Sequence, residues 1–125
     1  MYTIGIKRNF VAQHFLIVGD GGAENQRHSH HYLLEVALEG PGLDDQGYLV
    51  DIDELSAIVN ELLNRYRDRT LNELSEFKGI NPSLEHFARI LGQAVAERLV
   101  PQSLKAVAIK LWENDEAWAA YRHSF

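Results

Sequence analysis

The chain has 125 residues, a length that suits a single domain with a substantial core. Its net charge of −6 disfavours a nucleic-acid partner, because like charges repel the phosphate backbone. No apolar run approaches the roughly 20 residues that cross a bilayer, and the first residues lack the pattern of a signal peptide. The sequence contains no cysteine, which excludes disulfides and thiolate ligands and fits a cytoplasmic protein.

Two strands are expected in the first third of the chain. Residues 2–15 and residues 28–39 both alternate, and the even positions of the second segment form one apolar row. A loop rich in glycine and polar residues separates them at 19–27. The apolar row begins with His28 and His30, so these histidines continue a face that points to the core. Buried imidazole is costly without a partner, and a metal ion would supply one.

Two amphipathic helices are predicted in the middle of the chain. Asp51 and Glu54 have the spacing of a capping box, and the apolar stripe that follows extends to Tyr66. Beyond a polar loop, Asn81-Pro82-Ser83 starts a second helix with its own apolar face.

Three further strands are predicted, a short one at 48–50, a longer one at 104–113 and a last short one at 118–121. Strands gathered around a helix pair favour an antiparallel sheet with helices on one face. The sequence therefore predicts an α+β fold in a single domain that spans residues 1–125.

Three histidines have the arrangement of a metal site. His28 and His30 are two residues apart on a strand, so their side chains leave the same face roughly 6.5–7 Å apart. His14 ends the preceding strand and can supply a third imidazole. Three histidines leave one tetrahedral position open, as in catalytic zinc sites. The alternative is that they are unrelated surface histidines.

Motifs along nearly the whole chain have the order and spacing of one known family. Phe10-Val11-Ala12-Gln13-His14 and His28-Ser29-His30-His31-Tyr32 contain the three histidines. They resemble the Phe-x-Ala-x-His and His-Gly-His-Asn-Tyr motifs of the 6-pyruvoyl-tetrahydropterin synthase / 6-carboxy-tetrahydropterin synthase family. The resemblance continues through Gly47-Tyr48-Leu49-Val50-Asp51-Ile52, Leu71-Asn72, Asn81-Pro82-Ser83-Leu84-Glu85, Glu113 and Tyr121.

This resemblance implies the tunnelling fold (T-fold), a four-stranded antiparallel sheet with two helices on one face, assembled as trimers or dimers of trimers. It also implies that His14, His28 and His30 bind Zn²⁺ and that Glu113 binds a pterin ring. A carboxylate suits that role because it accepts two parallel hydrogen bonds, from a ring N–H and an exocyclic amine.

The sequence departs from the family at its acid–base residues. The family's catalytic cysteine lies four residues before the first histidine of His-x-His, where this chain has Glu24. The family's aspartate–histidine pair aligns with Arg67-Asp68, so the histidine is missing and Asp68 is the candidate that remains. The metal and ring-binding positions persist, whereas the acid–base set has changed.

Three functions are compatible with this pattern. We expect a zinc-dependent pterin lyase that acts on 7,8-dihydroneopterin triphosphate, with Glu24 and Asp68 moving protons. In an aldolase-type alternative, Glu24 is the base and the product is 6-hydroxymethyl-dihydropterin. The family subgroup with that reaction carries its glutamate one residue nearer the histidines. In a non-catalytic alternative, the chain is a pterin- or purine-binding module, with Glu24 as a fourth metal ligand or a solvated residue.

Overall fold

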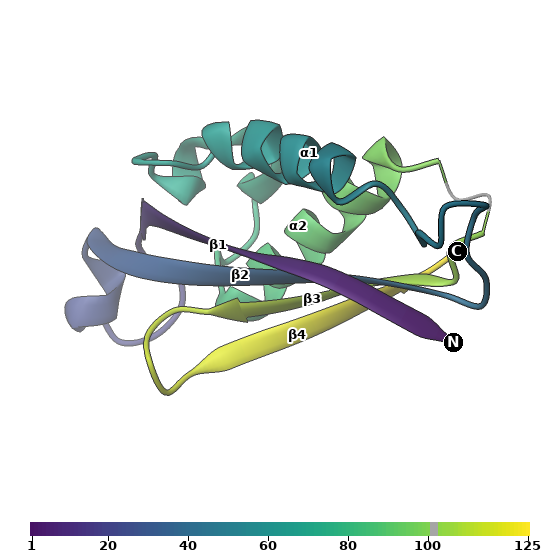
Figure 1. The fold of residues 1–125 in the computed structure, drawn as a ribbon. Helices are drawn as coiled ribbons and strands as arrows, with labels where there is room; N and C mark the ends of the chain where they lie inside the picture. The colour runs from purple at the N-terminus through teal and green to yellow at the C-terminus, as the bar shows by residue number, and fades with distance from the viewer. Residues whose placement is uncertain (101–102) are drawn as a thin grey trace.

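The computed structural model describes residues 1–100 and 103–125. Four strands form one antiparallel sheet in the order β1-β2-β3-β4, and two α-helices cover one of its faces (Figure 1). The strands are β1 (Tyr2–His14), β2 (His28–Gly40), β3 (Ala106–Trp112) and β4 (Trp118–Ser124), and the helices are α1 (Ile52–Asn64) and α2 (Leu84–Arg98). Three short 3-10 turns complete the elements, η1 (Ala23–Asn25), η2 (Leu71–Glu73) and η3 (Ser75–Phe77). This architecture confirms the predicted α+β layout.

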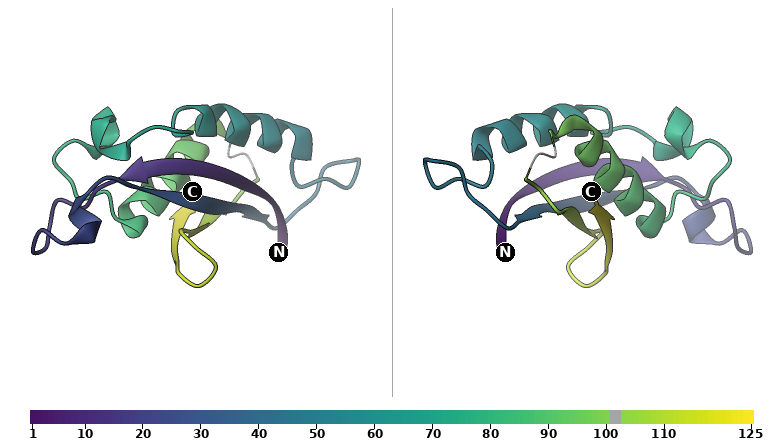
Figure 2. Two further views of the ribbon diagram at one scale, coloured as in Figure 1. Left: turned by 90° about the vertical axis from the view of Figure 1, so that its left-hand side faces the viewer. Right: turned by 90° about the vertical axis from the view of Figure 1, so that its right-hand side faces the viewer.

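The apolar row of β2 forms the core face of the sheet, as its alternation predicted. Leu34, Val36 and Leu38 are buried, and β3 places Leu111 and Ile109 opposite the first two. Residues paired in this way share a face, so the register builds one continuous apolar layer beneath the helices. Figure 2 shows how strongly β1 and β2 curve under α1.

Both helices begin at side-chain caps. Asp51 accepts a hydrogen bond from the backbone N–H of Asp53, and Ser83 accepts one from the N–H of His86. The buried positions of each helix recur every three or four residues, so each presents one apolar stripe to the sheet. Among the described residues, no helix combines the length and apolar character needed to cross a membrane.

The prediction of a short strand at 48–50 is wrong, because that segment is a loop. The Asp44 carboxylate accepts hydrogen bonds from the backbone N–H groups of Gln46 and Tyr48, each at 2.9 Å. The N–H of Asp44 donates in turn to the Tyr48 carbonyl. These local bonds use the backbone groups that a strand would offer to a neighbour. Leu49 is buried and anchors the loop to the core.

β4 continues to Ser124, beyond the predicted end at residue 121. Its inward-facing Tyr121 lies against Gly92 of α2, where a Cβ atom would come within 2.7 Å of the ring. A glycine in mid-helix is costly in conformational entropy. Here it allows α2 to pack closely on β4.

An ionic cluster joins the end of α1 to the segment that precedes α2. Arg65 donates to both carboxylate oxygens of Glu76 at 2.6 Å, and the Tyr66 hydroxyl donates to the same carboxylate at 2.8 Å. The hydrogen bonds from Arg65 are the main cause that lowers the pKa of Glu76 to about 2. The carboxylate is therefore stabilised in its charged form.

Replacing Glu76 with glutamine is expected to lower the free energy of unfolding at pH 7 by about 1–2 kcal/mol. This value is smaller than the free energy that the whole pKa shift would correspond to, because the Arg65 side chain is 46% exposed and solvent screens the ion pair. Because folding lowers the pKa of Glu76, the ionised carboxylate contributes its full stabilisation above the unfolded-state pKa of about 4.3. This contribution is lost as the pH falls toward 2. Urea denaturation between these limits measures the effect, with Glu61→Gln, exposed on α1, as the control. A difference that stays constant with pH would contradict the assignment.

Candidate functional site

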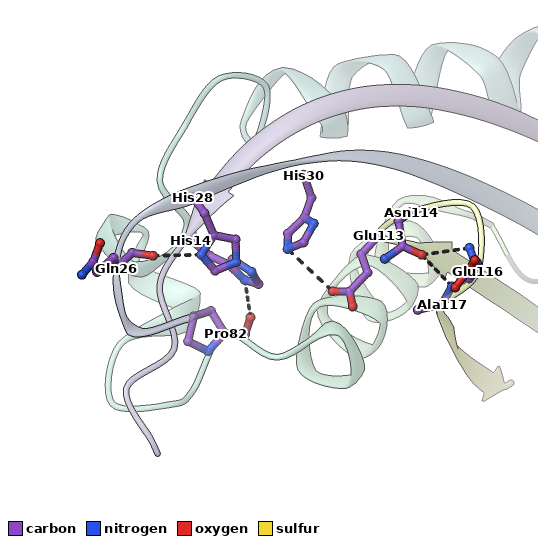
Figure 3. A network of polar contacts seen from close by, with 9 residues as sticks. All are labelled: His14, Gln26, His28, His30, Pro82, Glu113, Asn114, Glu116 and Ala117. Carbon is purple, nitrogen blue, oxygen red and sulfur yellow. Dashed lines mark hydrogen bonds and ion pairs between the residues drawn. The ribbon is translucent and has the colours of Figure 1, made fainter. Parts of the chain in front are cut away.

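The three predicted metal ligands lie together at one end of the sheet. The strand register pairs His14 of β1 directly with His28 of β2, and His30 follows on the same face. The three ring centroids are 4.6–5.0 Å apart in pairs. One ring nitrogen of each histidine lies within 4.8 Å of the other two. The structure thus brings these imidazoles around one small space (Figure 3).

Backbone carbonyls orient two of the three rings. His14 Nδ1 lies 2.8 Å from the Pro82 carbonyl oxygen, and His28 Nδ1 lies 2.8 Å from the Gln26 carbonyl oxygen (Figure 3). A carbonyl oxygen can only accept, so each Nδ1 carries a hydrogen, and in the neutral form of each ring Nε2 is the nitrogen with the lone pair. Both rings are therefore held in the tautomer that presents Nε2 to a metal.

The charge state of His14 also suits a metal. The residue is 3% exposed, and burial is the main cause that lowers its pKa below the ordinary value. The nearby rings of His28 and His30 lower the pKa further, while the bond to Pro82 and the charge of Glu24 oppose the shift. Neutral imidazole is the form that binds metal. Three imidazoles gathered in this way are a donor set that fits Zn²⁺.

Carboxylates line the cavity that opens on the triad. The cavity has a volume of about 420 Å³, and Glu24, Glu85 and Glu113 contribute to its wall together with the three histidines. Glu113 directly follows β3, and its Oε2 atom lies 3.9 Å from Nε2 of His30. Burial, and then the charge of Glu113, raises the pKa of the neighbouring Tyr32. The predicted ring-binding carboxylate therefore lies beside the three histidines.

Glu24 reaches the same cavity from η1, in the loop between β1 and β2. Its charge acts on His14, whose pKa it raises. Within the described part of the chain, no side-chain or backbone donor forms a hydrogen bond with its carboxylate. This carboxylate is accordingly available to a bound metal or substrate.

Asp68 lies away from the triad. It is exposed in the segment after α1, with a φ of 57°, and its backbone N–H donates to the Val11 carbonyl at 2.7 Å. It does not line the cavity that contains the three histidines. The structure thus brings Glu24, but not Asp68, to the three histidines of the same chain.

Two other histidines, His31 and His86, have different surroundings. His31 leaves the opposite face of β2 and, with Trp112, lines a second cavity of about 610 Å³, whose wall also includes His30 and Glu113. His86 lies in the first turn of α2, with Nδ1 2.7 Å from the Asn81 carbonyl oxygen. It supports the turn that presents the Pro82 carbonyl to the site.

Three asparagines hold the loop between β1 and β2. Asn72 accepts a hydrogen bond from the N–H of Phe15 at 3.0 Å and donates to the Phe15 carbonyl at 2.8 Å. Asn81 accepts one from the N–H of Ile17 at 2.9 Å, and Asn25 donates to two loop carbonyls at 2.7 Å each. The sequence marked the first two asparagines only as motif residues. The hydrogen bonds of the structure show that both hold the loop next to His14 in place.

Asn72→Ala is expected to weaken zinc binding about tenfold and to destabilise the fold by about 1–3 kcal/mol. The substitution leaves both backbone groups of Phe15 unpaired directly beside His14. Zinc titration by calorimetry and urea denaturation measure the two effects. Asn60→Ala is the matched control, because Asn60 only accepts an exposed bond from Arg8. Equal zinc affinity in the two variants would show that Asn72 does not position the site.

Comparison with known proteins gives consistent relatives. The family model described as 6-pyruvoyl tetrahydropterin synthase matches residues 3–124. The chain is 29% identical over 89 residues to dihydroneopterin monophosphate aldolase of Pyrococcus furiosus, covering 71% of this chain and 72% of that protein. It is 26% identical over 117 residues to 6-carboxy-5,6,7,8-tetrahydropterin synthase of Bacillus subtilis, covering 89% and 78%. The structure of Caenorhabditis elegans 6-pyruvoyl tetrahydropterin synthase superposes with a TM-score of 0.85 at 23% identity, covering 98% of this chain and 96% of that one.

Proposed function

The chain belongs to the 6-pyruvoyl tetrahydropterin synthase family and has the T-fold, and from this premise we propose a zinc-dependent pterin lyase that acts on 7,8-dihydroneopterin triphosphate. Members of this family are pterin-metabolising lyases. The observation that carries the proposal is the placement of Glu113 3.9 Å from His30, within one cavity with the triad. Ring binding and metal binding can thus act on one substrate.

Glu113 is the proposed anchor for the pterin ring. A 2-amino-4-oxo ring presents an N–H and an amino group along one edge, and a carboxylate accepts both. Glu113 follows the last residue of β3, so a rigid sheet sets its position. A ring held there would lie in the cavity that the three histidines also line.

His14, His28 and His30 are the residues that would hold Zn²⁺, which when bound supplies a Lewis acid for the oxygens of the substrate side chain. The chain's own groups move the protons. Glu24 is the proposed base, because its carboxylate lines the same cavity and has no hydrogen-bond donor among the described residues. The carbonyls of Pro82 and Gln26 keep two imidazoles in the ligating tautomer throughout.

An aldolase-type reaction is the second candidate, and the presence of the Glu24 carboxylate in the triad cavity favours it. In this reaction Glu24 takes the proton of the second side-chain hydroxyl, and the carbon–carbon bond between the first and second side-chain carbons breaks. Its electron pair passes into the pterin ring system, and the first carbon is then protonated. The products are 6-hydroxymethyl-dihydropterin and a two-carbon aldehyde. The similarity to a dihydroneopterin monophosphate aldolase supports this alternative.

Product analysis tests both reactions. Zinc-loaded protein is incubated with 7,8-dihydroneopterin triphosphate and, separately, with the monophosphate, and the pterins are separated by chromatography. A 6-pyruvoyl or 6-carboxy product supports the synthase reaction, whereas 6-hydroxymethyl-dihydropterin supports the aldolase. Unchanged substrates, under conditions in which an authentic synthase turns over, would contradict both and favour the non-catalytic pterin- or purine-binding module.

We further propose assembly as a trimer or dimer of trimers in the cytoplasm. In the described part of the chain, β1 and β4 each have only one neighbouring strand. Open sheet edges are ready to pair with another chain. Asp68 lies outside the triad cavity, so a catalytic role for it requires that a second copy bring its own Asp68 there. Light scattering coupled to size-exclusion chromatography measures the assembly.

A further inference from the structure

Tyr32 lies directly beside Glu113 in the sheet. The register between β2 and β3 pairs Leu33 with Trp112, so its continuation by one residue places Tyr32 opposite Glu113. Residues opposed in this way have Cβ atoms about 4.5–5.5 Å apart and share a face. Both side chains therefore leave the sheet on the face that carries His30.

Aromatic neighbours hold the Tyr32 ring in place. The Phe10 ring is stacked on it at 5.1 Å, and the Phe87 ring meets it edge-on at 5.3 Å. The His30 imidazole lies on a further side, with ring centroids 5.7 Å apart. The whole residue is 1% exposed. Its hydroxyl accordingly has little freedom to move.

The Tyr32 hydroxyl has no hydrogen-bond partner among the residues that the structure describes. The other phenol in the core differs, because the Tyr66 hydroxyl donates to Glu76 at 2.8 Å. Buried tyrosine hydroxyls normally have a partner, since an unpaired buried hydroxyl costs free energy. Every fully buried side-chain oxygen or nitrogen in the described residues is paired. The small exposed part of Tyr32 therefore lies at its hydroxyl, on the face of the sheet that also carries Glu113 and His30.

We propose that Tyr32 is a further substrate-binding residue, whose hydroxyl donates a hydrogen bond to the ring carbonyl of a heterocycle held by Glu113. The inference rests on the proposed pterin-binding function and deepens it. In a 2-amino-4-oxo ring the carbonyl is adjacent to the ring N–H, so the acceptor lies next to the groups that the carboxylate binds. A phenol is a donor at neutral pH and a carboxylate is only an acceptor. Together Glu113 and Tyr32 select a ring edge with two donors followed by one acceptor.

Tyr32→Phe tests this inference, because it removes one hydroxyl and keeps the ring. The probes are pterin itself and 2,4-diaminopteridine, in which an amino group replaces the carbonyl and the adjacent ring nitrogen has no hydrogen. We expect the variant to bind pterin about 10-fold more weakly than the wild type and to bind the diamino compound at least equally well. Zinc affinity and the thermal midpoint should stay unchanged. Tyr48→Phe, at an exposed tyrosine in the loop after β2, is the matched control.

The possible results separate this inference from the proposed function. Wild-type binding of pterin that Tyr32→Phe leaves unchanged would overturn the inference alone. Equal losses for both probes, or a parallel fall in the thermal midpoint, would assign Tyr32 to packing and also overturn it. A zinc-loaded wild-type protein that binds neither pteridine would contradict the proposed function, and the inference with it.

Discussion

Zinc binding is expected to fall more than 100-fold when either His28 or His30 is replaced by alanine. Changes to groups that merely orient metal ligands already cost 10–100-fold, and these substitutions remove a ligand itself. The chain has no cysteine to replace the lost imidazole. Competition titration against a chelator of known affinity, with metal analysis of the purified protein, measures the effect.

His31→Ala is the matched control for these variants. His31 is adjacent to His30 in sequence but leaves the opposite face of β2 and does not line the cavity that the three histidines share. It should keep the zinc affinity of the wild type. Comparable losses in all three variants would show that the triad is not the metal site, and so would a His28→Ala protein that keeps full affinity.

The sequence was sufficient to predict which face of β2 points to the core and that the three histidines lie together. Strict alternation along β2 puts His28 and His30 in the same row as Leu34, and a hairpin brings His14 opposite His28. These relations are local in sequence, because they depend only on the alternation along a strand and on one loop between two consecutive strands. The fold class followed from the same patterns and from the motifs. The loop at 48–50 was missed because a local Asp44 turn competes with extension.

The surroundings of the triad could not be predicted in the same way. The pairing of Tyr32 with Glu113 depends on the register of two strands that are far apart in the sequence. The carbonyls of Pro82 and Gln26 are backbone groups, which no residue type reveals. Glu24 was predicted as a candidate from its spacing to His28. Its presence in the cavity depends on the asparagine hydrogen bonds that hold the loop, which the spacing does not reveal.

Glu24→Gln is expected to lower kcat at least about 100-fold while leaving the affinities for zinc and pterin unchanged. General base catalysis contributes about 10²–10⁴-fold, and glutamine keeps the size of glutamate but cannot accept a proton at neutral pH. Single-turnover measurements with the substrate identified by product analysis give the rate of the chemical step. Asp20→Asn, an exposed acid in the same loop, controls for the change of loop charge.

The zinc affinity of Glu24→Gln decides between the two roles that its carboxylate can have. A base that only touches substrate leaves metal affinity intact, so the loss appears in kcat alone. A fourth ligand closes the open coordination position, so its removal weakens zinc binding and leaves a site open to water. Weakened zinc binding would therefore contradict Glu24 as the base. Unchanged turnover with unchanged zinc affinity would exclude both roles and make Glu24 a solvated loop residue.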